Sequence, residues 1–228
     1  MKIDILSLFP SYFRGPFDVS MLGRAQEKGL IEICHTDIRD FAVHKNGRVD
    51  DRPFGGGPGM VLCPQPVASA IRSVRKSGSH VVYLSPQGAL LNAAKCEELS
   101  KKEHLIILCG HYEGIDERAL QKEVDEEISI GDYVLTSGCA AAIVLVDAVA
   151  RFIPDVIGHP EAVAQDSHSW DGGFDCSHWT RPPVWEEMAV PQVLLGGNHA
   201  EIHKWRREEA LKKTNRVRPE LGADFAPG

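Results

Sequence analysis

Short apolar runs separated by helix-like segments constrain the fold of this chain more than any other feature. Four runs rich in Ile, Leu and Val have the length of buried strands: 2–9, 30–36, 80–85 and 104–109. The segments between and after them predict helices at 17–29, 64–76, 89–101, 116–127 and 139–153. Strands that alternate with helices form parallel sheets, because each parallel connection has to cross over the sheet. The sequence therefore predicts an α/β domain with a largely parallel sheet.

The pattern changes near residue 154. Residues 154–173 combine Pro, Gly, His, Ser and Asp with little periodicity, which is typical of a linker. Residues 184–189 predict a short turn of helix, and 199–214 predict a longer helix with Asn198 as its N-cap. The stretch 199–218 has seven Lys or Arg against three Glu in a chain of net charge −7. Taken alone, this basic segment favours an ordinary solvent-exposed helix.

Bulk properties exclude several classes of protein. No apolar run of about 18 residues predicts a membrane span, and the start of the chain does not have the pattern of a signal peptide. The six cysteines form no CxxC pair, which favours reduced thiols and a cytoplasmic location. The chain has neither a GxxxxGK[ST] phosphate loop nor a GxGxxG after its first strand. Composition and motifs thus argue against a P-loop NTPase and an ordinary dinucleotide-binding enzyme.

Glycine-rich segments are the first candidates for a binding site. Residues 45–60 are so rich in Gly and Pro that they predict a loop without regular structure. Glycines also follow three predicted strands, at 83–88, 109–114 and 129–138. Ligands of parallel α/β sheets bind at the carboxyl ends of strands, so these segments could line one pocket. The alternatives are a flexible surface loop and ordinary turns.

Few single residues indicate chemistry by pattern alone. Arg151 follows Asp147 by four residues, which predicts either an intrahelical ion pair or a fixed cation facing a pocket. Asp166, in the predicted linker, is by its position most simply a turn or cap residue. His199 and His203 share one predicted helix but have no third ligand nearby, so no metal site is predicted.

Whole segments, in contrast, resemble one known family. The string VDDRPFGGGPGM at 49–60 resembles the signature loop of the bacterial tRNA (guanine-N1)-methyltransferases, the TrmD family. Further matches follow in the same order: YLSPQG at 83–88, GHYEGIDER at 110–118, SIGDYVLTSG at 129–138, DAVARFIP at 147–154, TRPPVW at 180–185, GNHAEIHKWRREEAL at 197–211 and RPEL at 218–221. The resemblance covers nearly the whole chain, so it is more specific than any single motif.

The resemblance implies a fold and an assembly. It implies a SPOUT-type α/β domain at 1–157, with a C-terminal trefoil knot at about 83–138. It implies a flexible linker at 158–173 and a small helical tRNA-binding domain at 174–228. It further implies a homodimer with its active site at the subunit interface. The whole protein is expected in the cytoplasm and away from membranes.

The resemblance also implies an activity, which is methyl transfer from S-adenosylmethionine to N1 of guanine at position 37 of tRNA. Asp166 would be the general base, acting across the dimer, and Arg151 would stabilise charge on the guanine carbonyl oxygen. A Mg²⁺ requirement is implied by the resemblance only. Cofactor contacts would come from Tyr83, Leu84, Ser85, Pro86, Gly110, Tyr112, Glu113, Gly114, Ile130, Gly131, Tyr133, Leu135 and Gly138. Substrate contacts would come from Asp50, Gly59, His111, Asp175, Lys204, Arg206 and Arg207.

The chain departs from the family pattern at a few positions. His111 stands where the family usually has arginine, and Ser137-Gly138-Cys139 replaces the commoner Gly-Gly-Glu. A non-glycine residue at 137 predicts a strained or a reshaped loop if the loop needs a positive φ there. Residues 167–175 are one residue longer than the family pattern. Two rival functions remain, namely a SPOUT methyltransferase with another RNA target and an RNA-binding protein without catalysis.

Overall fold

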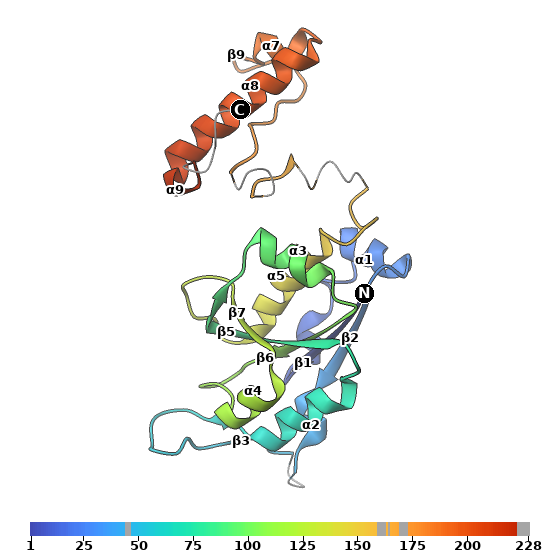
Figure 1. The fold of residues 1–228 in the computed structure, drawn as a ribbon, viewed down its shortest axis with the longest axis vertical. Helices are drawn as coiled ribbons and strands as arrows, with labels where there is room; N and C mark the ends of the chain where they lie inside the picture. Colours follow the sequence, from blue (N-terminus) through green and yellow to red (C-terminus); the bar gives the residue numbers. More distant parts are fainter. Residues whose placement is uncertain (44–46, 159–162, 164, 169–172, 223–228) are drawn as a thin grey trace. The chain divides into compact units, whose positions relative to one another are not determined.

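A five-stranded parallel sheet forms the centre of the computed structural model, which describes residues 1–43, 47–158, 163, 165–168 and 173–222 (Figure 1). Its strands are β1 (Lys2–Ser7), β2 (Glu32–Asp37), β5 (Ser79–Leu90), β6 (His104–Cys109) and β7 (Glu126–Ser129). They lie in the order β2-β1-β6-β5-β7, and every neighbouring pair is parallel. The predicted parallel α/β sheet is confirmed.

Helices cover both faces of this sheet (Figure 1). One face packs against α1 (Ser20–Glu27), α3 (Ala93–Ser100) and α5 (Gly138–Ala150), and the other against α2 (Pro64–Val74) and α4 (Glu117–Glu123). Successive residues of β6 alternate between the two cores: Leu105 and Ile107 belong to the first, Ile106 and Leu108 to the second. All six residues of β6 are buried, which is why this strand reads as a continuous apolar run.

The end of β5 and the start of α3 differ from the predictions. The strand was expected at 80–85, but it continues to Leu90 and returns to pair with β7. Helix α3 therefore begins at Ala93 instead of residue 89. Its N-cap is Asn92, whose side chain accepts a hydrogen bond of 2.9 Å from the Lys95 amide. The start predicted at 89 was wrong because tertiary pairing with β7 extends the strand.

Two further predictions need correction in the part of the chain that forms this sheet and its helices. The acidic helix expected at 116–127 ends at Glu123, and residues from Glu126 onward form β7. The loop expected at 45–60 contains the short strand β3 (Asp50–Asp51), which pairs with β4 (Val61–Leu62). A hairpin stem thus supports the glycine-rich residues between them.

The chain divides into two compact units, Met1–Gly158 and His159–Gly228. The second unit contains a two-stranded hairpin of β8 (Val184–Trp185) and β9 (Met188–Ala189). The helical turn predicted at 184–189 was therefore wrong. The two turn residues, Glu186 and Glu187, have φ of 46° and 65°. A hairpin turn of this geometry usually contains Asn or Gly, so two glutamates gave no sequence signal.

The second unit also contains the helices α7 (Gln192–Leu195), α8 (His199–Val217) and α9 (Pro219–Gly222). The prediction that Asn198 caps the long helix is confirmed, since its side chain accepts from the Glu201 amide at 3.5 Å. Helix α8 buries only Ala210 and Thr214. Most of its surface is therefore polar and available for other contacts.

Candidate functional site

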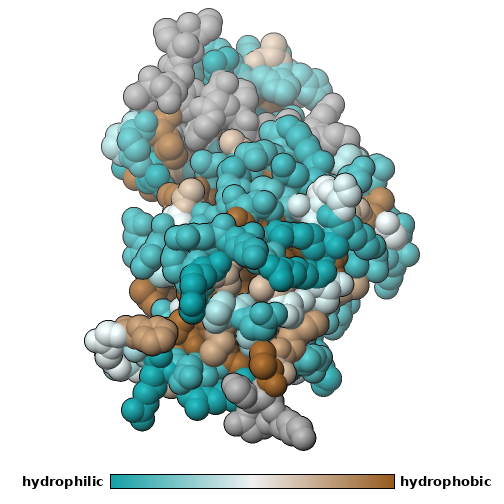
Figure 2. Space-filling view, turned by 60° about the horizontal axis from the view of Figure 1, so that its bottom comes forward, coloured by the Kyte–Doolittle hydropathy of each residue, from teal (hydrophilic) through white to brown (hydrophobic). Residues whose placement is uncertain are grey.

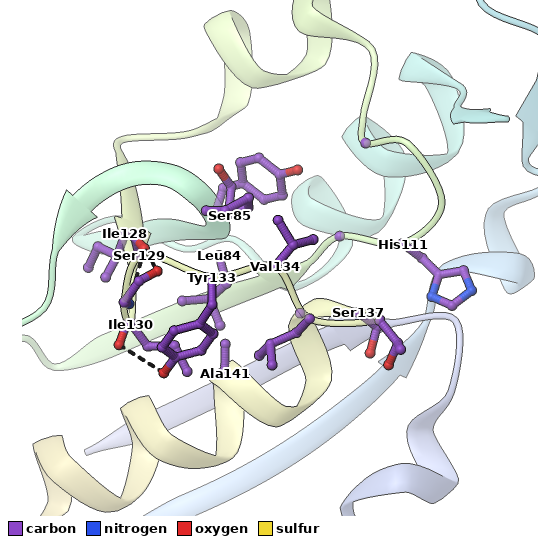
Figure 3. Close-up of a pocket in the computed structure, with 18 of the residues that line it drawn as sticks. Leu84, Ser85, His111, Ile128, Ser129, Ile130, Tyr133, Val134, Ser137 and Ala141 are labelled. Carbon is purple, nitrogen blue, oxygen red and sulfur yellow. Dashed lines mark hydrogen bonds between the residues drawn. The ribbon is translucent and has the colours of Figure 1, made fainter. Parts of the chain in front are cut away.

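A cavity of about 210 Å³ lies at the carboxyl ends of β6 and β7 and beside the middle of β5 (Figure 3). Its lining comes from three segments, 83–86, 110–114 and 128–138, together with Ala141 in the first turn of α5. The three strands are neighbours in the sheet, so the three segments meet at one edge. This is the usual place for a ligand in a parallel α/β sheet.

The pocket brings together every residue for which a cofactor contact was predicted. These residues are Tyr83, Leu84, Ser85, Pro86, Gly110, Tyr112, Glu113, Gly114, Ile130, Gly131, Tyr133, Leu135 and Gly138. Six other lining residues were not predicted to contact the cofactor: Ile128, Ser129, Val134, Thr136, Ser137 and Ala141. Most of these lie within the matched stretch 129–138, so the stretch as a whole was the available signal.

One wall of the pocket is a bulge in β5. Ile128 of β7 pairs first with Leu84 and again with Ala89, so the residues between them leave the strand. The Gln87 amide donates to Ser85 Oγ at 2.9 Å, and Ser85 Oγ donates to the Glu127 carboxylate. These bonds hold the bulge in one shape.

The floor of the pocket is a close contact between two loops. The Gly138 amide donates a hydrogen bond of 2.8 Å to the Gly110 carbonyl oxygen. A Cβ at residue 138 would lie 2.9 Å from the Cys109 Cα atom and 2.9 Å from the Gly110 nitrogen. Only glycine allows the two backbones to approach this closely.

Ser137 precedes helix α5 without strain, because the loop does not need a positive φ at this position. Its φ of −164° and ψ of 166° are those of extended backbone, which any residue adopts. The Ser137 hydroxyl accepts a hydrogen bond of 3.3 Å from the Cys139 amide. The residue acts as an ordinary serine N-cap, so its presence keeps the loop intact.

A tyrosine ring closes another side of the pocket (Figure 3). Tyr133 is 55 % exposed, and its hydroxyl donates to the Ile130 carbonyl at 3.2 Å. The ring lies so close to Gly131 that a Cβ there would be 2.3 Å from it, and Gly131 has a φ of 155°. Glycine at 131 therefore permits the ring to fold over the pocket.

Tyr83 contributes a neutral polar group to the wall. Burial raises the pKa of its phenol to about 12, and the charges of Glu127 and Glu117 act in the same direction. Its hydroxyl lies 3.0 Å from the position that a Cβ of Gly110 would occupy. At neutral pH this phenol is protonated and can donate a hydrogen bond into the pocket.

The signature loop meets the pocket at Glu113. A Cβ at Gly59 would lie 2.4 Å from the Glu113 carboxylate, and Gly59 itself has a φ of 78°. Asp50, at the foot of the loop, accepts a hydrogen bond from Arg48 Nε at its carbonyl oxygen. The predicted substrate residues Asp50 and Gly59 therefore belong to the segment beside the pocket wall.

His111 lines the outer part of the pocket, and Figure 3 shows its ring directed away from Tyr133. The ring lies edge-on to Phe9 at 5.1 Å and to Tyr112 at 4.5 Å. Its Nδ1 atom is buried and has no hydrogen-bond partner within the described part of the chain. The imidazole thus packs as an aromatic group at the pocket rim.

The two predicted catalytic residues do not line this pocket. Arg151 is the C-cap of α5, whose first residue, Gly138, is at the pocket. The helix has 13 residues, so its two ends are about 20 Å apart at 1.5 Å per residue. That distance exceeds the reach of an arginine side chain. Asp166 belongs to the second unit, where it is partly buried and its amide donates to the Val163 carbonyl at 3.4 Å.

The remaining predicted substrate residues also lie in the second unit. Asp175 accepts from the Cys176 amide at 2.6 Å and lies 2.9 Å from His178 Nε2. Lys204, Arg206 and Arg207 are exposed on α8. Among the described residues no cluster of three or more His, Cys, Asp or Glu could hold a metal ion, and no helix has the length and apolarity to cross a membrane.

Comparison with known proteins identifies the family. Residues 1–224 match the family model described as tRNA (Guanine-1)-methyltransferase TrmD. A tRNA (guanine-N(1)-)-methyltransferase of Protochlamydia amoebophila (strain UWE25) is 64% identical over 97% of this chain and 99% of its own. Proteins of the same name from Chlamydia pneumoniae and Dictyoglomus turgidum are 57% and 52% identical, over 99% and 97% of this chain.

The relatives differ in length. The chain spans 62% of the Chlamydia pneumoniae protein and 89% of that from Dictyoglomus turgidum. The match to the family model nevertheless runs through both units of the structure. The resemblance seen in the sequence is confirmed, and the chain belongs to the tRNA (guanine-1)-methyltransferase family TrmD.

Proposed function

We propose that this protein transfers a methyl group from S-adenosylmethionine to N1 of guanine at position 37 of tRNA. The observation that carries the proposal is that the segments 83–86, 110–114 and 128–138 line one pocket. We further infer that the region 83–138 forms the trefoil knot that the family resemblance implies.

The pocket fits the donor in its chemistry. Leu84, Ile130 and Leu135 supply apolar surface for an adenine ring. The close-packed loops at Gly110 and Gly138 supply backbone donors and acceptors, which suit the polar edges of a nucleoside. When bound, the sulfonium supplies an activated methyl group, so no covalent enzyme intermediate is needed. The protein's task is then to position the acceptor and to move one proton.

Proton removal is assigned to Asp166. N1 of guanine carries a proton, and a carboxylate within hydrogen-bond reach can accept it. Arg151 is assigned to the carbonyl oxygen, where negative charge develops as N1 loses its proton. A preorganised charge of this kind is typically worth roughly 3–4 kcal/mol.

Geometry favours a homodimer as the working form. Arg151 lies about 20 Å along α5 from the pocket of its own chain, so we infer that it serves the pocket of the partner subunit. Val144 on α5 and Val134 beside the pocket are exposed, 47 % and 80 %, which suits burial against a second copy. The second unit, with exposed basic residues on α8, would hold the tRNA phosphates.

Methylation of tRNA transcripts with the position-37 guanine either intact or replaced tests the proposal. We expect transfer to the first transcript only. Transfer to both would indicate another RNA target, and calorimetry with S-adenosylmethionine that shows no binding would indicate a non-catalytic RNA-binding protein. We expect Asp166→Asn to bind the cofactor as the wild type does but to lose turnover.

A co-expression experiment tests the shared site. At a cofactor concentration too low to fill the damaged pocket, a Gly138→Ala chain and an Asp166→Asn chain are each expected to be inactive alone. In an equal mixture of the two chains, half of the dimers are mixed, and each mixed dimer contains one intact site out of two. About a quarter of the wild-type activity should therefore return. No recovery would place Asp166 at the pocket of its own chain.

A further inference from the structure

Phe54 is the most exposed large hydrophobic side chain among the described residues. It is 99 % exposed, and the next in order, Val134, is 80 % exposed. The face drawn in Figure 2 is mostly hydrophilic, as expected of a protein surface. A fully exposed phenylalanine ring does not contribute hydrophobic stabilisation to the fold. Its ring leaves water only when another molecule covers it.

The foot of the Phe54 loop is fixed to the pocket wall. In β4 the Leu62 amide donates to the Gly114 carbonyl at 3.0 Å, and just before this strand the Met60 carbonyl accepts from the Glu113 amide at 2.9 Å. Glu113 and Gly114 both line the pocket. The loop therefore ends on the backbone that forms the site, and its first strand is held there by pairing with β4.

The glycines at the tip of the loop have open space around them, whereas the glycine at its foot does not. Gly55, Gly56 and Gly57 have φ of 84°, 80° and 120°, and no atom of the described chain approaches the places where their Cβ atoms would be. Gly59, in contrast, is closed against Glu113. From Gly59 the chain can span at most roughly 17 Å to Phe54 at about 3.3 Å per residue. The phenyl ring is thus held at the end of a loop whose base contacts the pocket wall.

The tip presents the exposed ring of Phe54 and, two residues before it, the exposed cation Arg52, so it can contact a base and a neighbouring phosphate together. Arg48 lies 3.2 Å from Asp51 and 3.7 Å from Asp50, so acidic groups on the stem offset its charge. A target guanine has to leave its stack to enter the pocket, which leaves a gap beside the neighbouring nucleotide. An aromatic ring fits such a gap and stacks on any base.

We propose that Phe54 stacks on a nucleobase adjacent to the guanine that is methylated. The inference rests on the proposed function and adds a residue that binds RNA at this site. A second copy of the chain is the other occupant that could cover the ring, and the experiment separates the two.

The test compares Phe54→Ala, Phe54→Leu and Phe54→Trp for binding of an anticodon stem-loop RNA and for kcat/KM. Loss of a base–aromatic stack weakens binding by roughly 5- to 100-fold. We expect that loss in the Ala and Leu variants, and nearly full retention in Trp. Two further RNAs carry an abasic nucleotide, one just before and one just after the guanine. One of these two RNAs should bind the wild type and Phe54→Ala with equal affinity, because the base that Phe54 stacks on is missing.

Val19→Ala, at another exposed apolar residue, is the matched control and should leave RNA binding unchanged. Cofactor affinity and thermal stability should be the same in all variants, because Phe54 has no packing to lose. Full activity of Phe54→Leu, or a monomeric Phe54→Ala by sedimentation, would overturn stacking. Inactive wild-type protein would instead refute the proposed function.

Discussion

The Gly138 amide donates to the Gly110 carbonyl oxygen at 2.8 Å, and this bond joins the loop after β6 to the first turn of α5. The two residues lie at the bottom of the pocket, and the atoms around Gly138 leave no space for a side chain. The shape of the pocket floor therefore depends on how closely two backbones approach.

Gly138→Ala is expected to damage both stability and cofactor binding. The added methyl group would lie 2.9 Å from the Cys109 Cα atom, so the loops have to separate. Overpacking of this kind costs typically 1–3 kcal/mol. Urea denaturation should show that loss, and calorimetry should show an affinity for S-adenosylmethionine at least about tenfold lower, which corresponds to 1.4 kcal/mol. Gly158→Ala, where the Cβ meets open space, is the control.

Tyr83 makes stability depend on pH in the alkaline range. Burial raises the pKa of Tyr83 to about 12, so the folded state keeps the proton that the unfolded chain loses near pH 10. The stabilisation is complete below pH 10 and is lost as the pH rises towards 12. The unfolding free energy of the wild type should therefore fall relative to Tyr83→Phe between these limits, by about 2–3 kcal/mol. An unchanged difference at pH 9 and pH 11.5 would contradict this, and Tyr12→Phe is the exposed control.

Cys139 is expected to ionise near neutral pH although it is 2 % exposed. A hydrogen bond from the Cys109 thiol lowers the pKa of Cys139 to about 7, and bonds from Ser137 and Ser7 act in the same direction. The pKa of Cys109 is raised by the same bond and by burial. Thiolate absorbance at 240 nm should rise with a midpoint near pH 7 in the wild type and not in Cys139→Ala.

The same thiolate contributes to stability. Since the pKa is lower in the folded state, this stabilisation is present above pH 9 and is lost as the pH falls through 7. Cys96→Ala is the control, because burial raises the pKa of that thiol. A neutral rise in absorbance that survives in Cys139→Ala would assign the ionisation to another group.

Glu123 connects α4 to α2 through a buried charge. Its carboxylate is 3 % exposed and lies 2.9 Å from Arg72 Nε and 2.8 Å from Arg75 Nη1. Glu123→Gln keeps the shape but removes the charge, and both arginines remain partly exposed. We expect a loss of about 1–3 kcal/mol in urea denaturation. Glu97→Gln breaks the exposed pair with Lys101 and should change stability by less than about 0.5 kcal/mol.

Local patterns predicted the sheet well because β6 and its neighbours are buried on both faces. Apolar runs such as His104–Cys109 can be recognised without knowledge of their partners. The end of β5 could not be predicted in this way, since residues 89 and 90 are held by a second pairing with Ile128 and Ser129. Long-range pairing overrides local preference there.

The pocket was predictable from matched segments, but its details were not. The glycines that follow the predicted strands indicated a shared pocket, but the hydrogen bond between Gly138 and Gly110 could not be predicted from them. The backbone angle of Ser137 could not be predicted, because the residue type alone does not determine φ. The hairpin at 184–189 was missed because a Glu-Glu turn has no glycine. The position of the site could thus be predicted from matched segments, whereas its geometry depends on long-range packing.

The close glycine contacts around the pocket also bear on inhibition. At positions 88, 131 and 138, a side chain would collide with backbone or with a ring. A compound that hydrogen-bonds to these main-chain groups would contact surfaces that point mutation cannot reshape without disturbing the fold. Resistance would therefore have to arise elsewhere, for example at the exposed rings of the rim or through increased expression of the enzyme.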